Sequence, residues 1–255
     1  MGDLSAIEWT DSTWNPVTGC TKVSPGCKFC YAERVTERWG RGKFTDIKLY
    51  RDRLRLPVKW RTPRRIFVNS MSDLFHERVP FSFIDEVLDV MRDAHQHIFQ
   101  VLTKRADRML AWHRSHGSAP IPGHIWLGVS VETPSYFWRI ERLREVNVAI
   151  RFVSAEPLLS SLREIDLRGI SWLITGGESG GPPERALVVQ TSRGWVPKPE
   201  ARVWVRELRD LCQADRVAFF HKQWGGPTPK AGGRRLDRRL WGEFPSSPIL
   251  QESLL

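Results

Sequence analysis

The run Arg65-Ile-Phe-Val-Asn69 is followed by an amphipathic stretch and then by the run Ile98-Phe-Gln-Val-Leu102, and this repeated unit decides the fold. Later runs of the same kind are Ile125-Trp-Leu-Gly-Val129, Ile150-Arg-Phe-Val153, Trp172-Leu-Ile-Thr175 and Val217-Ala-Phe-Phe220. Short, mainly apolar runs rich in β-branched residues are typical of strands that are buried on both faces. Each run therefore predicts a strand of a parallel sheet.

The segments between these runs predict helices. After Pro80, Ser82 is a candidate N-cap with Asp85 three residues later, and apolar residues follow at helical spacing. Tyr136, Ile140 and Leu143 form a second apolar face. A third helix is expected to begin at Pro199, with apolar positions at Ala201, Val205, Leu208 and Cys212.

Alternating strands and helices predict a single α/β domain with right-handed crossovers. We expect a full or partial parallel β/α (TIM-like) barrel of about six to seven strands, including one near the cysteines. An open doubly wound sheet is the alternative, but no G-x-G-x-x-G follows the first strand. The barrel is expected over residues 1–224, and residues 225–255 are expected to form an irregular, basic C-terminal extension.

The composition is that of a globular protein, because the 255 residues are 41% hydrophobic and 27% charged. No apolar run approaches the length of a membrane span, and the first residues do not resemble a secretory signal. Four unevenly placed cysteines do not form a disulfide scaffold for a chain of this size. We therefore expect a protein of the reducing cytoplasm, with no membrane partner.

Three of the four cysteines, Cys20, Cys27 and Cys30, lie within the loop at 20–30. Three thiolates are a metal site with one ligand missing, and an iron–sulfur cluster held by three cysteines leaves one iron open. A zinc ion with a distant fourth ligand is the alternative. Cys212 lies on the apolar face of its predicted helix, where a buried and inert thiol is expected.

Polar residues follow the predicted strands, and in a β/α barrel functional groups gather at the carboxyl ends of the strands. Carboxylates there suit ribose hydroxyls or an ammonium group, and Lys104 suits a carboxylate or phosphate. The pair Gly176-Gly177 would let backbone approach a ligand closely, although a tight turn explains it equally well. The candidate cofactor-binding residues are Asn69, Ser70, Asp73, Lys104, Ser130, Glu132, Glu156, Gly176, Gly177 and Glu178.

The formal net charge is +10, and the excess is clustered. A basic stripe comprises Arg51, Arg53, Arg55, Lys59, Arg61, Arg64 and Arg65. A second cluster comprises Lys230, Arg234, Arg235, Arg238 and Arg239. Such clusters are typical of proteins that bind polyanions, and the stripe is predicted to bind nucleic acid. A basic, solvated surface is the alternative.

The spacing C-x6-C-x-Φ-C, in which Φ is Phe29, resembles the cluster loop of radical S-adenosylmethionine enzymes. Their commonest spacing is C-x3-C-x-Φ-C, so the first gap here departs from the type. The chain also resembles the phage Gp37/Gp68 family (DUF5131-type) over almost its full length. The matching segments are Trp14–Cys20, Cys27–Ala32, Val68–Asp73, Leu102–Arg105, Leu127–Glu132, Arg151–Leu158, Gly176–Gly180 and Lys222–Gly225.

The resemblance implies that the three cysteines hold a [4Fe-4S] cluster and that S-adenosyl-L-methionine binds its open iron. One electron, from a reductant such as flavodoxin or ferredoxin, would then yield a 5′-deoxyadenosyl radical. Phe29 would pack beside the adenine, and Ser130 and Glu132 would contact the ribose. Residues Asn69 to Asp73 stand where such enzymes often carry Gly-Gly-Glu, and the Gly-Gly-Glu at 176–178 lies too late in the chain to replace it.

The resemblance implies a radical enzyme, and together with the basic charge it favours a nucleotide or a nucleic-acid base as the substrate. The resemblance to a phage family also implies a bacterial protein that a phage or prophage could encode. No residue is assigned as the catalytic group. The competing hypothesis is a non-enzymatic nucleic-acid-binding protein with a structural metal, zinc or iron–sulfur, at the cysteine loop. A redox sensor that carries a cluster is a third.

Overall fold

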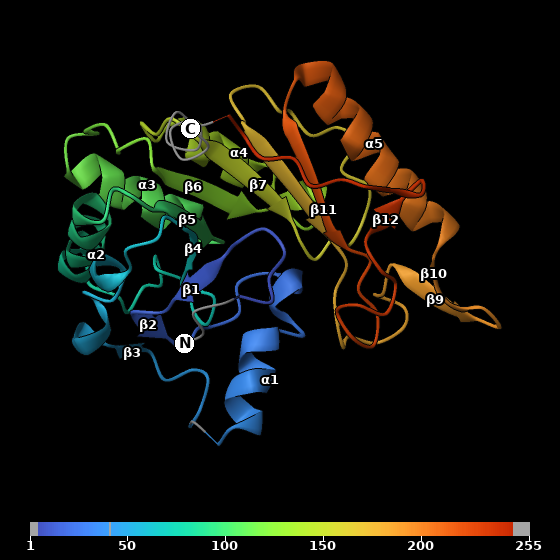
Figure 1. Cartoon of the computed structure of the whole chain (residues 1–255), viewed down its shortest axis with the longest axis horizontal. Helices are drawn as coiled ribbons and strands as arrows, with labels where there is room; N and C mark the ends of the chain where they lie inside the picture. The colour runs from blue at the N-terminus through green and yellow to red at the C-terminus, as the bar shows by residue number, and fades with distance from the viewer. Residues whose placement is uncertain (1–4, 41, 247–255) are drawn as a thin grey trace.

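The computed structural model describes residues 5–40 and 42–246, which form one seven-stranded parallel sheet with helices on its outer face (Figure 1). Its strands, in spatial as well as chain order, are β1 (Ser12–Trp14), β4 (Arg65–Val68), β5 (Ile98–Thr103), β6 (Ile125–Ser130), β7 (Arg151–Ala155), β8 (Trp172–Gly176) and β11 (Ala218–Gln223). The sheet is curled, and within the described residues its edge strands β1 and β11 do not pair with each other. It is therefore a partial barrel. The predicted strands and barrel are confirmed.

Helices cover the sheet because their apolar faces pack on its outward-pointing side chains. They are α2 (Phe81–Asp93), α3 (Ala106–Ser115), α4 (Trp138–Arg144) and α5 (Pro199–Asp215). Helix α1 (Tyr31–Arg38) instead follows the cysteine loop, lies apart from these four in Figure 1 and has Ala32 as its one buried residue. Single 3-10 turns are η1 (Pro25–Cys27), η2 (Arg51–Arg53), η3 (Pro57–Lys59) and η4 (Pro134–Tyr136). The helix at Pro199 is confirmed, and its Cys212 is wholly buried.

The predicted N-cap of α2 is wrong. Pro80 occupies the cap position with extended backbone, and its carbonyl accepts from the N–H groups of Phe83 and Ile84. Ser82 therefore lies inside the first turn, and no side chain caps the helix. Proline is well suited to this entry because it has no N–H that would need a partner.

Three two-stranded antiparallel sheets lie outside the main sheet, at its rim or beyond it (Figure 1). They are β2 (Val17–Thr18) with β3 (Lys48–Leu49), β9 (Val188–Thr191) with β10 (Gly194–Pro197), and β12 (Arg235–Leu236) with β13 (Arg239–Leu240). The last lies in the segment predicted to be irregular, and it is ordered there because Leu236 and Trp241 are buried in the core. Residues 247–255 of that segment lie outside the described residues. No helix of the described part of the chain is long and apolar enough to cross a membrane.

The concave side of the sheet is filled by aromatic rings. Trp172 is central, because its ring lies between 5.6 and 6.0 Å from the rings of Trp9, Trp126, Phe152 and Phe220. Every second residue of a strand points to this face. Further along the same strands the inward positions become small, at Ser130, Ser154 and Gly176. The large rings thus form a floor, and the inward side chains nearer the carboxyl ends are small.

Gly128 leaves room for the Phe152 ring, because a Cβ at that position would lie 2.5 Å from ring atoms. We expect Gly128→Ala to lower the free energy of unfolding by about 1–3 kcal/mol, since a buried ring must move. Adding Phe152→Leu should recover part of that loss. Urea unfolding measures both effects. Gly123→Ala is the matched control, because a Cβ there meets nothing within 4 Å, and equal stability of the two alanine variants would contradict the prediction.

Candidate metal centre at the carboxyl ends of the strands

The three cysteines lie on one loop at the carboxyl end of the sheet. Cys20 follows β2, beyond Gly19, whose φ of +88° and contact with the Asp46 backbone exclude a side chain. Cys27 ends η1, and Cys30 immediately precedes α1. All three are half-buried free thiols, so three sulfur donors are available on one short loop.

Arg105, directly after β5, holds Cys20 in place. Its Nη1 lies 3.5 Å from Cys20 Sγ and 3.3 Å from Asp73 Oδ2. Its Nη2 donates to the carbonyl and hydroxyl oxygens of Thr21, both at 3.0 Å, and its Nε donates to Glu77. Burial raises the pKa of the Cys20 thiol to about 11, while the guanidinium acts in the opposite direction. Arg105 therefore favours the thiolate form that a metal requires.

Glu132, just beyond β6, fastens the middle of the cysteine loop. Its wholly buried carboxylate accepts from Ser24 Oγ at 2.6 Å and from Arg139 Nη1 at 3.0 Å. The loop lies so close that a Cβ on Gly26 would come within 2.5 Å of Glu132 Oε1. A buried carboxylate needs such partners, because an unpaired charge in the interior is very costly. The predicted ribose contact of Glu132 stays a prediction, since both oxygens already have protein partners.

A second buried carboxylate, Glu178, fastens the same loop from β8. Arg185 donates to Glu178 Oε2 at 2.7 Å and to Oε1 at 2.8 Å. The same guanidinium donates to the carbonyl of Pro25 at 3.0 Å and lies 5.2 Å from the centre of the Phe29 ring. Glu178 thus acts on the cysteine loop through Arg185, and Phe29 is held beneath a cation.

Asp73 is a joint between two strand ends. Its Oδ1 accepts from Thr103 Oγ1 at 2.7 Å and from the N–H of Phe75 at 3.0 Å, and its Oδ2 accepts from the N–H of Lys104 at 3.0 Å. Together with Arg105, these donors occupy the carboxylate and join the turn after β4 to the end of β5. Its predicted role in binding a cofactor amine stays a prediction.

Asn69, in contrast, keeps one donor open. Its backbone is left-handed, with φ of 61°, and its Oδ1 accepts from the N–H of Val17 at 3.2 Å. Its Nδ2 is buried and has no hydrogen-bond partner among the described residues. The neighbouring Ser70 contacts Asn15 through its hydroxyl and accepts from Tyr31 through its carbonyl. A buried donor without a partner suits a ligand that brings an acceptor.

Two lysines face carboxylates at the strand ends. Lys104 Nζ lies 3.7 Å from Glu132 Oε1, and Lys222 Nζ lies 2.6 Å from Glu156 Oε1. Burial lowers the pKa of Lys104, but Glu132, Cys27 and Cys30 more than offset this, so the pKa lies above its usual value. Lys104 is therefore an ammonium group near two of the three sulfurs.

Gly176 and Gly177 each allow a different close contact. A Cβ on Gly176 would come within 3.0 Å of the Glu156 carboxyl group, so this glycine leaves room for a strand-end side chain. A Cβ on Gly177 would come within 2.1 Å of the Trp224 carbonyl oxygen. The close approach at Gly177 is thus made by the segment after β11, as expected for a tight packing of backbone against backbone.

The three free thiols are the sulfur donors that a metal group at this loop would use. No three His, Cys, Asp or Glu side chains of the described residues converge on a site for a single metal ion. A four-iron cluster binds each cysteine through a different iron, and three cysteines leave one iron open. That the loop holds such a cluster stays a prediction.

The basic stripe does not lie at this site. It runs along the outside of α2, where Arg51 pairs with Glu86 and Arg55 pairs with Asp93. It ends at the opposite end of the sheet, where Arg65 begins β4 and pairs with Asp11. The guanidiniums of Arg53 and Arg64 lie over Tyr50 and Trp60, and Lys59 and Arg61 are exposed. Nucleic-acid binding by the stripe stays a prediction, separate from the cysteines.

Sequence reasoning did not assign Arg139 and Arg185, which complete the two buried ion pairs. Each follows its glutamate by seven residues, Glu132 and Glu178 respectively. The first lies on α4 and the second in an irregular segment, so the shared spacing does not correspond to one type of local structure. Arg105 was visible only as one of several polar residues after β5.

The fold resembles that of spore photoproduct lyase. One mutant structure superimposes with a TM-score of 0.53 and 13% identity, over 82% of this chain and 75% of the other. Another, with bound AdoMet and dinucleoside spore photoproduct, gives the same values. A complex with dinucleoside spore photoproduct gives a TM-score of 0.50 at 13% identity, over 81% of this chain and 74% of the other.

No curated protein matches the chain. Residues 4–245 match the family described as "Protein of unknown function (DUF5131)". That range includes the cysteine loop, every strand of the sheet and both buried glutamate–arginine pairs. Since the match spans nearly the whole sequence, the chain belongs to the DUF5131 family.

Proposed function

We propose that this protein is a radical S-adenosylmethionine enzyme that acts on a nucleotide or a nucleic-acid base. The observation that carries the proposal is the cysteine loop itself. Its three free thiols lie at the carboxyl end of a partial β/α barrel, and Arg105, Glu132 and Arg185 fasten the loop to three different strand ends. Such supporting contacts are typical of metal ligands that must be held in a fixed orientation.

Cys20, Cys27 and Cys30 would hold the [4Fe-4S] cluster, and S-adenosyl-L-methionine would bind beside them. When bound, the two groups supply a one-electron cleavage that makes a carbon radical able to abstract hydrogen from an unreactive carbon. The buried Nδ2 of Asn69 would donate to an acceptor of the cofactor. Lys104 would balance negative charge near Cys27 and Cys30.

The residues on the concave side of the sheet would control access of water and the space beside the cysteines. The aromatic floor around Trp172 closes the concave side of the sheet, which excludes water from below the site. The small inward side chains of Ser130, Ser154 and Gly176 leave room above that floor. A ligand beside the cysteines would therefore lie above this floor.

Two observations support a nucleotide or a nucleic acid as the substrate. A structural neighbour is named as a complex with AdoMet and a dinucleoside photoproduct, and this chain carries a net charge of +10. A base within a duplex would have to be extruded before its atoms reached a recessed site. The electron would come from a small reductant protein such as flavodoxin or ferredoxin. The finer Gp37/Gp68 assignment stays a prediction.

Replacing Cys20, Cys27 and Cys30 together by alanine should abolish both iron binding and cofactor cleavage. Anaerobically reconstituted wild-type protein should hold about four irons per chain. Given S-adenosylmethionine and dithionite, it should form 5′-deoxyadenosine, which the triple variant should not. Iron analysis and chromatography of the product measure the two effects.

Cys212→Ala is the matched control, because that thiol is wholly buried on α5, in a helix remote in sequence from the loop, and the variant should keep the iron. One zinc per chain, with no response to S-adenosylmethionine, would instead support a nucleic-acid-binding protein with a structural metal. A cluster that is reduced reversibly without forming product, even with nucleotides and DNA present, would support a redox sensor.

Ser24→Ala should loosen the cysteine loop without unfolding the barrel. The variant loses the hydrogen bond to Glu132, whereas Arg139 still pairs with the carboxylate. A hydrogen bond to a charged group contributes about 1.5–3 kcal/mol, so we expect iron to be lost to a chelator about tenfold faster. The melting temperature of the protein should change little.

Ser135→Ala is the control for this variant, since Ser135 is exposed on η4. Equal rates of iron loss in the two variants would show that the Ser24–Glu132 contact does not hold the loop.

A further inference from the structure

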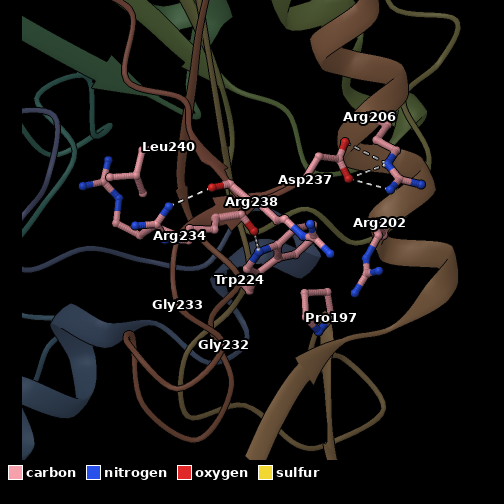
Figure 2. Close-up of a pocket in the computed structure, with 11 residues that line it drawn as sticks. Pro197, Arg202, Arg206, Trp224, Gly232, Gly233, Arg234, Asp237, Arg238 and Leu240 are labelled. Carbon is pink, nitrogen blue, oxygen red and sulfur yellow. Dashed lines mark hydrogen bonds and ion pairs between the residues drawn. The ribbon is translucent and has the colours of Figure 1, made fainter.

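A second, strongly basic site lies between α5 and the β12–β13 hairpin. The structure has a pocket there of about 710 Å³ (Figure 2). Its charged lining is Arg202, Arg206, Arg234, Arg235, Asp237 and Arg238. Figure 2 shows side chains of the helix and of the hairpin approaching one another across this pocket. Nothing in the proposed cysteine chemistry uses these residues.

The single carboxylate of the lining is already neutralised. Asp237 accepts from Arg206 Nε at 3.1 Å and from Arg209 Nη1 at 2.9 Å. Within residues 5–40 and 42–246, no carboxylate pairs with any of the other four lining guanidiniums, those of Arg202, Arg234, Arg235 and Arg238. Like charges gathered in one pocket repel each other, so an anionic ligand would be strongly favoured.

The two-residue turn that joins β12 and β13 has an unusual backbone conformation at Arg238, one of the pocket residues. Asp237 and Arg238 have φ of 52° and 65°, so both central residues of the two-residue turn are left-handed. Such turns usually carry glycine at the second position, because a side chain there is disfavoured. The turn thus places the Arg238 side chain in the lining of the basic pocket, at a position where glycine would be less strained.

The pocket adjoins the candidate metal centre through the segment after β11. Trp224 lines the pocket, and its backbone carbonyl is the group that approaches Gly177. Gly226 continues the same segment and exchanges backbone hydrogen bonds with Glu178 and Gly180. A chain of phosphates held in the pocket would thus lie next to the loop that carries Glu178.

We propose that this arginine pocket binds successive phosphate groups of a single-stranded nucleic acid. Four guanidiniums without a carboxylate partner exceed what one phosphate requires, and guanidinium forks match phosphate oxygens. Two of them have other contacts, because Arg235 Nη1 donates to the Arg238 carbonyl at 2.7 Å and the Arg234 guanidinium lies 5.2 Å from the centre of the Phe220 ring. Exposed Leu240 adds an apolar surface beside the arginines, which suits the base of a bound nucleotide. The proposal concerns phosphate binding and does not depend on the cysteine loop carrying a cluster.

The test is the affinity of the full chain for a fluorescein-labelled single-stranded DNA 12-mer, measured by anisotropy over a range of salt concentrations. Arg202→Gln with Arg238→Gln should weaken binding about tenfold or more at low salt. The slope of log Kd against log salt should also fall by about 1.4, because about 0.7 is expected per phosphate contact with a single strand.

Arg92→Gln with Arg163→Gln is the matched control, since it removes the same charge from exposed sites on α2 and on a distant loop. Equal affinities and slopes in the two double variants would overturn the proposal. Displacement of the 12-mer by adenosine monophosphate or inorganic phosphate at concentrations near the Kd of the strand would also overturn it, in favour of a small-anion site.

Arg238→Gly separates binding from folding. Glycine relieves the left-handed backbone at that position, so the melting temperature should stay the same or rise by about a few degrees. Affinity for the 12-mer should nevertheless fall. A variant that melts higher and still binds like the wild type would show that the arginine has no role in binding.

Discussion

The buried carboxylate of Glu132 is the contact on which the candidate site depends. It lies wholly inside the protein, and it is tolerated there because Arg139 and Ser24 satisfy it. Ser24 belongs to the cysteine loop, so neutralising this charge also positions the loop. The Glu178–Arg185 pair repeats the arrangement at the end of β8, two strands away from β6 in the sheet. Two ion pairs thus convert a flexible Gly/Pro loop into a fixed platform for three sulfurs.

The barrel separates stability from chemistry along each strand. Its first half carries the aromatic floor around Trp172, and its second half carries small or charged inward residues such as Ser130 and Lys104. The end with the cysteines therefore combines small inward side chains with charged groups. The basic stripe lies along α2 and ends at the other end of the sheet, whereas the arginine pocket adjoins the Glu178 loop. These positions favour the pocket as the surface that works together with the site.

Much of the fold could be predicted from local pattern. The run at Ile125–Val129 is apolar enough to require burial on both faces, and the α5 positions from Ala201 to Cys212 repeat at helical spacing. The prediction of Ser82 as an N-cap was wrong, because Pro80 had already set the entry to α2. Helix α1 was not predicted, because it precedes the repeated units and Ala32 is its one buried residue.

The sequence by itself determined the parallel β/α architecture and the three-cysteine loop, because both follow from residue types at short, regular spacings. The tertiary structure decided which polar residues serve that loop. Glu132 and Glu178 looked like ligand groups, yet Ser24 of the cysteine loop donates to Glu132, and Arg185 links Glu178 to the Pro25 carbonyl of the same loop. It also decided that Arg202 and Arg238 share a pocket. Such contacts depend on how the strands and loops meet in space, and local sequence spacing carries no record of them.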